Sequence, residues 1–110
     1  MSAEFTKSKT FSLATSVEYS ENATVSKMVI RRDVGNITLF AFDKGQSLST
    51  HSAPYDAFVQ VIEGRGVIEI DKQPFELGAG ECIVMPADVP HAVKAEERFK
   101  MMLVMIRGRE

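Results

Sequence analysis

The chain has two histidines, His51 and His91, and they are its clearest candidates for chemistry. An imidazole can bind a metal ion, form hydrogen bonds with a ligand, or move a proton near neutral pH. Two nitrogens alone hold a metal weakly, because a catalytic metal site commonly has three protein ligands and an open position. Neither histidine has the partners of a catalytic triad at a recognisable spacing, so nucleophilic hydrolysis is not expected.

The sulfur-containing side chains are interpreted as structural. A single cysteine, Cys82, excludes an internal disulfide and a thiolate cluster, and its place in an apolar segment predicts a buried thiol. Thioether sulfur suits copper(I), and four methionines follow in the second half of the chain: Met85, Met101, Met102 and Met105. In a strand, Met102 would face away from its two neighbours, so we interpret these methionines as core residues.

The composition narrows the class of protein. Fifteen acidic and thirteen basic residues give a net charge of -2, and the sequence has no basic stripe, so neither nucleic acid nor an anionic membrane is an expected partner. No apolar run approaches the ~18 residues of a membrane span. The polar N-terminus lacks the features of a secretory signal, and we therefore expect a cytoplasmic protein.

Short apolar segments recur between turn residues, at the spacing typical of an all-β sandwich or barrel. The clearest are 26–32, 36–43, 57–63, 66–71, 74–77, 81–85, 91–94 and 99–106. Eight such strands fit a jelly roll. Glycines at 63–66 and the run 71–74 predict tight turns. We divide the chain into an N-terminal arm, 1–24, a barrel, 25–106, and a C-terminal tail, 107–110.

Two parts of this plan are less regular. Within the arm, residues 10–19 are compatible with a single strand or with irregular chain. The segments 57–62 and 101–106 are apolar on both faces, so both faces need a cover. A second sheet would cover one face, and a partner subunit would cover the other.

The two histidine segments resemble the two motifs of the cupin family. Residues 45–64 match the spacing of G-x5-H-x-H-x3,4-E-x6-G, with Ala53 at the place of the second histidine and Ala57 at the place of the glutamate. Residues 80–95 resemble G-x5-P-x-G-x2-H-x3-N, with Gly80, Pro86 and His91 in agreement. Asp88 replaces the glycine of this motif, and Ala95 replaces its asparagine.

The resemblance implies a cupin-type double-stranded β-helix, a single jelly-roll barrel with a pocket inside one mouth, and a homodimer. It also implies that His51, Ala53, Ala57 and His91 line that pocket. Because two family ligands are replaced by alanine, our leading hypothesis is a small-molecule-binding domain without a tightly bound metal, in which the two imidazoles form hydrogen bonds with the ligand.

Two alternatives stay open. One is a metal-dependent cupin enzyme of the dioxygenase or isomerase type, with zinc, iron, manganese, nickel or copper on His51 and His91. Asp56 is its candidate third ligand, although it lies one residue before the glutamate position, which reverses the face in a regular strand. The other is an assembly module whose barrel is filled by Phe40, Phe58 or Phe99.

Overall fold

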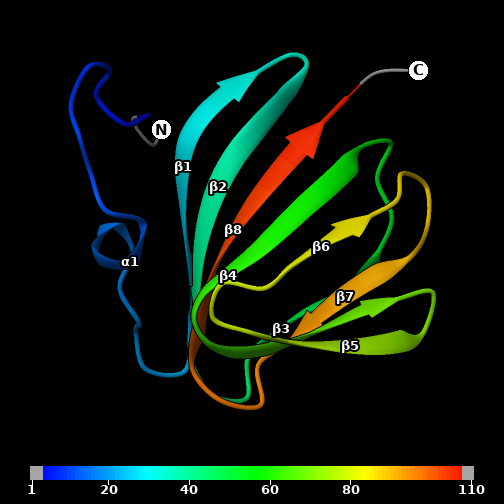
Figure 1. Ribbon diagram of the computed structural model, residues 1–110. Helices are drawn as coiled ribbons and strands as arrows, with labels where there is room; N and C mark the ends of the chain where they lie inside the picture. Colours follow the sequence, from blue (N-terminus) through cyan, green and yellow to red (C-terminus); the bar gives the residue numbers. More distant parts are fainter. Residues whose placement is uncertain (1–3, 108–110) are drawn as a thin grey trace.

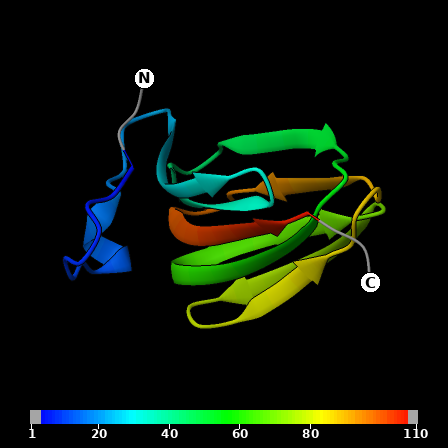
Figure 2. The same ribbon diagram turned by 90° about the horizontal axis from the view of Figure 1, so that it is seen from above.

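The protein is an antiparallel β-barrel with an N-terminal arm against its outer side (Figures 1 and 2). The computed structural model describes residues 4–107. Its elements are α1 (Leu13–Ser16), β1 (Thr24–Arg32), β2 (Gly35–Phe42), β3 (Ser47–His51), β4 (Asp56–Ile70), β5 (Gln73–Gly78), β6 (Cys82–Met85), β7 (His91–Lys94) and β8 (Phe99–Ile106). The predicted all-β jelly roll is confirmed. Of the predicted tail, only Arg107 lies in the described part.

Strand β4 is shared by both sheets of the barrel. Its first half pairs with β6 and β8, and its second half pairs with β5 and β7. The prediction of two strands, 57–63 and 66–71, separated by a turn is wrong, because the 15-residue strand runs on without a break. Gly64 has φ 76° and the register with β8 shifts between Val61 and Glu63, so this glycine bends the strand.

Strand β3 was missing from the predicted set. Four of its five residues are exposed, and only Leu48 is partly buried. The segment therefore has no alternation of apolar and polar residues that would indicate a strand. It pairs with β7 alone, at one end of the strand order. The predicted reversal after β4 is confirmed, since Asp71 and Lys72 have φ 51° and 70° in the two-residue turn to β5.

Aromatic rings fill one end of the barrel. Phe42 and Phe99 are fully buried and stack with their ring centroids 4.8 Å apart. A Cβ on Gly66 would lie 2.5 Å from the Phe99 ring, so β4 has no side chain at this point of contact. On β8, Phe99 lies opposite Phe42, and Met105 lies opposite Ala57 near the other end of the strand. The phenylalanines thus leave the opposite end of the interior to smaller and softer side chains.

The arm covers the outer face of the sheet. Val17, Leu39 and Ala41 are fully buried in a second apolar cluster. Partly buried residues pack around it: Phe5, Leu13, Tyr19, Val25, Val29, Ile62 and Met102. The arm therefore covers this part of β2, β4 and β8, for which a partner subunit was expected. Between residues 4 and 23 the structure has a one-turn helix and no strand. The homodimer stays a prediction.

Polar contacts fix the arm at a buried cation. Lys100 is only 7% exposed, and its Nζ donates to the carbonyl of Ala14 at 2.6 Å. The Tyr19 hydroxyl donates to Glu63 at 2.8 Å, and the Lys100 and Arg98 cations each lie 5.0 Å from the Tyr19 ring centroid. Burial and the neighbouring Glu63 carboxylate raise the pKa of Tyr19. The tyrosine therefore stays protonated as a hydrogen-bond donor.

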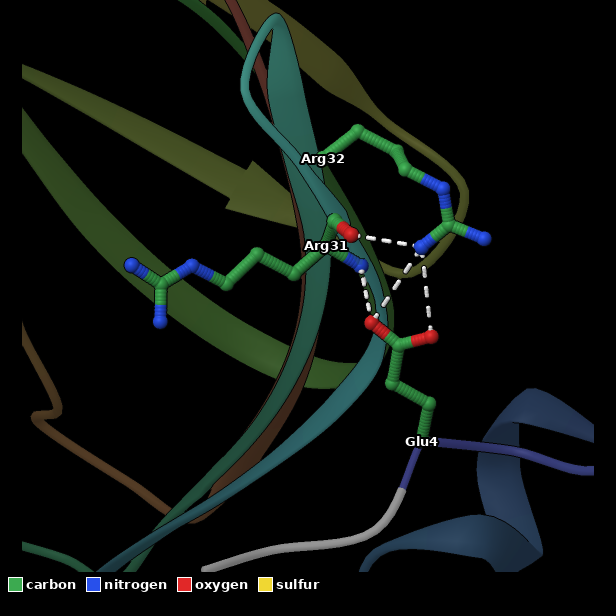
Figure 3. Close-up of polar contacts among 3 residues, drawn as sticks. All are labelled: Glu4, Arg31 and Arg32. Carbon is green, nitrogen blue, oxygen red and sulfur yellow. Dashed lines mark hydrogen bonds and ion pairs between the residues drawn. The ribbon is translucent and has the colours of Figure 1, made fainter.

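The start of the arm caps the free edge of β1. Figure 3 shows Glu4 accepting from the Arg31 backbone N–H at 2.7 Å and from the Arg32 guanidinium at 3.3 Å. The Phe5 N–H donates to the Val29 carbonyl at 3.1 Å. The Arg31 N–H is the main cause of the lowered pKa of Glu4. The Arg31 N–H and the Val29 carbonyl, which would otherwise be unpaired at the edge of the sheet, thus form hydrogen bonds with the arm.

Cys82 is exposed, and the expectation of a buried thiol is wrong. Along β6, Ile83 and Met85 pack into the core, so the alternate positions Cys82 and Val84 face outward. An apolar sequence did not reveal which face is covered. In the described residues no helix has the length and apolar character to cross a membrane. The cytoplasmic location stays a prediction.

We expect the arm to stabilise the folded barrel. Val17→Ala removes two methyl groups from a fully buried site and should lower the free energy of unfolding by about 1.5–3 kcal/mol. Urea denaturation measures this change. The matched control is Val34→Ala at a 68% exposed position, which should change stability by less than about 0.5 kcal/mol. Equal effects of the two substitutions would contradict a docked arm.

Candidate functional site

The two histidines lie side by side on neighbouring strands. His51 ends β3, His91 begins β7, and the two residues are direct partners in the antiparallel ladder. Their ring centroids are 4.4 Å apart with an edge-to-face arrangement at 67°. His51 is exposed, whereas His91 is 7% exposed. The pair therefore has one imidazole at the rim and one inside the barrel.

A β-bulge brings His51 into this position. Leu48 is paired with Val93, and the next aligned pair is His51 with His91, so β3 has two intervening residues where β7 has one. Residues three apart in a regular strand face opposite sides. The extra residue restores the inward direction, so Leu48 and His51 both line the interior.

Backbone carbonyls determine which ring nitrogens carry protons. Nδ1 of His51 lies 2.8 Å from the Ser49 carbonyl oxygen, and Nδ1 of His91 lies 3.2 Å from that of Val89. A carbonyl oxygen only accepts, so in each ring Nδ1 is the donor. In the neutral rings Nε2 then keeps its lone pair. The site thus offers two imidazole acceptors.

The environment favours the uncharged form of the inner ring. Burial lowers the pKa of His91, and the nearby His51 lowers it further, while the bond to the Val89 carbonyl acts in the opposite direction. His91 is therefore neutral near physiological pH. This inner imidazole can act as a Lewis base without adding positive charge to the barrel.

The histidines open onto a small apolar cavity of about 40 Å³. Its walls are Leu48, His51, Ala57, Met85, His91, Val93, Met101, Leu103 and Met105. One buried water molecule needs about 10–15 Å³ of such a cavity, so this cavity has room for about three water molecules. Among the described residues, no phenylalanine lines this cavity, although Phe40 and Phe99 pack in the core behind it. Phe58, the third residue of the assembly-module alternative, does not line it either.

Nitrogen and sulfur donors enter the cavity from opposite walls. His51 and His91 come from β3 and β7, whereas three methionines come from β6 and β8. Ala57 is the direct partner of Met85 on one side and of Met105 on the other. Sequence reasoning treated the methionines as core residues, and it missed that Met85, Met101 and Met105 share a cavity with both histidines. Only the strand pairing brings them together.

The other predicted site residues have different positions. Ala53 does not line the cavity, and its carbonyl accepts from the Asp88 N–H at 2.8 Å. The exposed Asp56 uses its carboxylate to accept from the Ala87 N–H at 2.9 Å. The two contacts join the end of the loop before β4 and the first residue of β4 to the loop before β7. Among residues 4–107, no three His, Cys, Asp or Glu side chains form a group that could hold a metal ion.

Asp88 explains one departure from the second motif. Its φ is 62°, in the left-handed region that favours glycine and that aspartate tolerates better than most residues. The chain thus keeps the backbone turn that the family's glycine would give. This turn leads directly into Val89, whose carbonyl orients His91.

A larger hollow lies elsewhere, beneath the arm. It has a volume of about 330 Å³ and is lined by residues that include Phe5, Phe11, Lys9 and Lys27. Phe5 and Phe11 meet edge to face with ring centroids 4.7 Å apart. Among the described residues, no histidine or acidic side chain lines this shallow hollow. The histidine cavity is therefore the better candidate site, because it combines enclosure with converging polar groups.

Comparison with known proteins identifies the family. The family model described as "Cupin domain" matches residues 38–107, which span β2 to β8. The chain belongs to the cupin family. Both histidines, the bulge in β3 and the Asp88 turn lie inside the matched region.

Relatives of known structure share the fold. A conserved protein of unknown function from Streptococcus pyogenes, SPY1581, is 34% identical with a TM-score of 0.91 over 98% of this chain and 95% of that chain. A cupin 2 conserved barrel domain protein from Leptotrichia buccalis is 45% identical with a TM-score of 0.87, over 88% of this chain and 47% of that one. The polyketide synthase CurC of Streptomyces cyaneus is 33% identical over 61 residues, which are 53% of this chain and 40% of that protein.

The metal site that the cupin motifs imply does not fit the residues present. That site uses three imidazoles and a carboxylate, and the cupin cavity described here offers two imidazoles and no carboxylate. Its remaining donors are thioethers, which hard or borderline divalent ions bind poorly. We therefore derive no reaction from a family-type divalent metal.

The contact between the two histidines predicts that a change at His51 alters the titration of His91. His51→Ala should raise the pKa of His91, because it removes a neighbouring imidazole and opens the inner ring to water. The measurement is an NMR pH titration of the imidazole carbon-bound protons. Ser47→Ala, at an exposed position on the same strand that does not line the cavity, is the control and should leave the titration unchanged. An unchanged His91 pKa in His51→Ala would contradict the contact.

The same shift has a consequence for stability. The folded-state pKa of His91 lies below its unfolded value of about 6.5. The unfolded chain then binds the proton more readily, so the contribution of His91 is complete above about pH 6.5 and is lost as the pH falls through the folded pKa.

The turn at Asp88 predicts a contrast between two substitutions. Asp88→Gly should change the free energy of unfolding by less than about 1 kcal/mol, because glycine adopts the positive φ without strain but has more freedom when unfolded. Asp88→Val should cost about 1–2 kcal/mol at this φ. Urea denaturation distinguishes them. A valine variant as stable as the glycine variant would argue against the left-handed turn.

Proposed function

We propose that this cupin binds a small ligand inside the barrel through the Nε2 atoms of His51 and His91. The observation that carries the proposal is the pair of Nδ1 contacts to backbone carbonyls, which hold both rings and leave both Nε2 atoms free. Among the described residues that line the apolar cavity beside them, these two nitrogens are the polar ring atoms available to a ligand. Such a combination is typical of small-molecule sites.

The direction of hydrogen bonding restricts the ligand. Two lone pairs need a hydrogen-bond donor or another electron-poor centre, and a small anion would meet acceptors and apolar walls. The enclosed part of the ligand is limited to about three non-hydrogen atoms by the size of the cavity. The exposed position of His51 lets a longer ligand extend past the rim.

The alternative of a dioxygenase or isomerase has less support. It needs a third strong ligand, and the Asp56 carboxylate is occupied by the Ala87 N–H on the loop side. The described residues also lack a cluster of three ligands that include an acid. A binding role requires only the two histidines and the cavity.

Binding is tested by NMR titration of isotope-labelled protein with acetamide, a donor, and acetate, an anion of similar size. Near neutral pH, acetamide should shift the ring resonances of both histidines, and acetate should shift them less. His51→Ala and His91→Ala should remove the response, while Ser47→Ala, at an exposed position on β3 outside the cavity, should keep it. Stronger binding of acetate, or shifts confined to the arm, would overturn the proposal.

A further inference from the structure

The cavity combines two imidazoles with three thioethers, and this set selects a particular class of ion. Met85 is 2% exposed, Met101 is fully buried, and Met105 is partly buried in the same core. None of these donors carries a negative charge. A soft ligand set of this kind favours copper(I) over zinc, manganese or magnesium.

We infer that the cavity of this cupin is a site for a soft monovalent metal ion, copper(I), held by His51 and His91 together with the thioethers of Met85 and Met105. The inference rests on the proposed function and names the electron-poor ligand of the same pair. It departs from the family's metal set, because sulfur takes the place of the missing carboxylate.

Strand register supports the choice of these two methionines. Ala57 stands at the family's glutamate position, and Met85 and Met105 are its direct partners on the two neighbouring strands. Met101 lies opposite Val61, deeper along β8, and forms the floor of the cavity. Two flexible thioethers thus flank the position from which the carboxylate is absent.

Charge supports a monovalent ion. The cost of transferring an ion into an apolar cavity rises steeply with its charge, and among the described residues no carboxylate lines this cavity to offset it. Among the described residues, the acid next to the cavity wall, Asp56, is bound to the Ala87 N–H.

Hydrogen bonds hold the two histidine rings and the Met105 thioether in place. Each histidine donates Nδ1–H to a backbone carbonyl, the arrangement that fixes a metal-binding imidazole. The Asn36 amide lies 3.9 Å from the Met105 sulfur and donates a weak hydrogen bond to it. A thioether sulfur has a second lone pair, so this bond leaves one for the ion. The exposed His51 marks the entry.

The test is a copper(I) titration against a competing chelator, bicinchoninate, under anaerobic reducing conditions. The protein carries Cys82→Ala throughout, because the exposed thiol would bind copper(I) independently. We expect one copper(I) per chain and sulfur scattering in the X-ray absorption spectrum. Silver(I), a redox-inert analogue, should shift the methyl signals of Met85 and Met105 in methyl-labelled protein, and zinc(II) should not.

Matched variants locate the sulfur ligands. Met85→Leu and Met105→Leu keep the side-chain volume and should each weaken copper(I) binding by about tenfold to a hundredfold. Met102→Leu is the control, because Met102 lies on the same strand as Met105 but packs under the arm. It should leave the affinity unchanged. Backbone amide spectra establish that each variant is folded.

The outcomes separate this inference from the proposed function. If acetamide shifts both histidines but copper(I) binds no tighter than zinc(II), or binds equally to all three methionine variants, the copper inference is wrong and the proposed function stands. If neither acetamide nor the metal ions affect the histidines, both are wrong. Copper coordinated by nitrogen alone would also overturn the inference.

Discussion

The site depends on one shared strand, because β4 is the only element among residues 4–107 that pairs with strands of both walls. Its first half holds β6 and β8, which carry the methionines, and its second half holds β7, to which β3 is attached. The bend at Gly64 turns one half toward the other. A Cβ there would lie 2.2 Å from the Arg98 carbonyl oxygen, so the bend is closed tightly against β8. The packing of glycine against backbone therefore decides whether nitrogen and sulfur donors face one another.

Two smaller backbone devices then aim the histidines. The bulge in β3 turns the His51 side chain toward the interior. The left-handed turn at Asp88 leads the chain into β7, where His91 pairs with His51. Both carbonyls that accept from the rings belong to residues two positions earlier in the chain. The orientation of the pair is thus local, whereas the cavity in front of it is a long-range product of the barrel.

This division explains what could be predicted from the sequence. The apolar strands and the hairpin at Asp71 have strong local patterns, so the jelly roll and the histidine pair were within reach. Strand β3 was missed because its exposed residues have no apolar alternation. The continuity of β4 is not evident from the sequence, because a glycine such as Gly64 is equally typical of a bend within one strand and of a turn between two strands. The sequence analysis expects a partner subunit on the outer face of the sheet. It does not find the arm there, because no periodic pattern of apolar residues around Val17 indicates which surface the arm contacts.

The methionines show most clearly why a site needs the fold. From spacing alone, Met102 excludes a common site with its neighbours, and the structure agrees that it packs under the arm. The same alternation, however, places Met105 on the inner face, and pairing across β4 adds Met85 from a separate strand. Ala57 leaves between them the space that a glutamate would fill. The loss of the carboxylate and the gathering of thioethers are therefore a single change in the cavity, from charged oxygen to neutral sulfur, and a neutral cavity stabilises an ion only when that ion is soft and carries little charge.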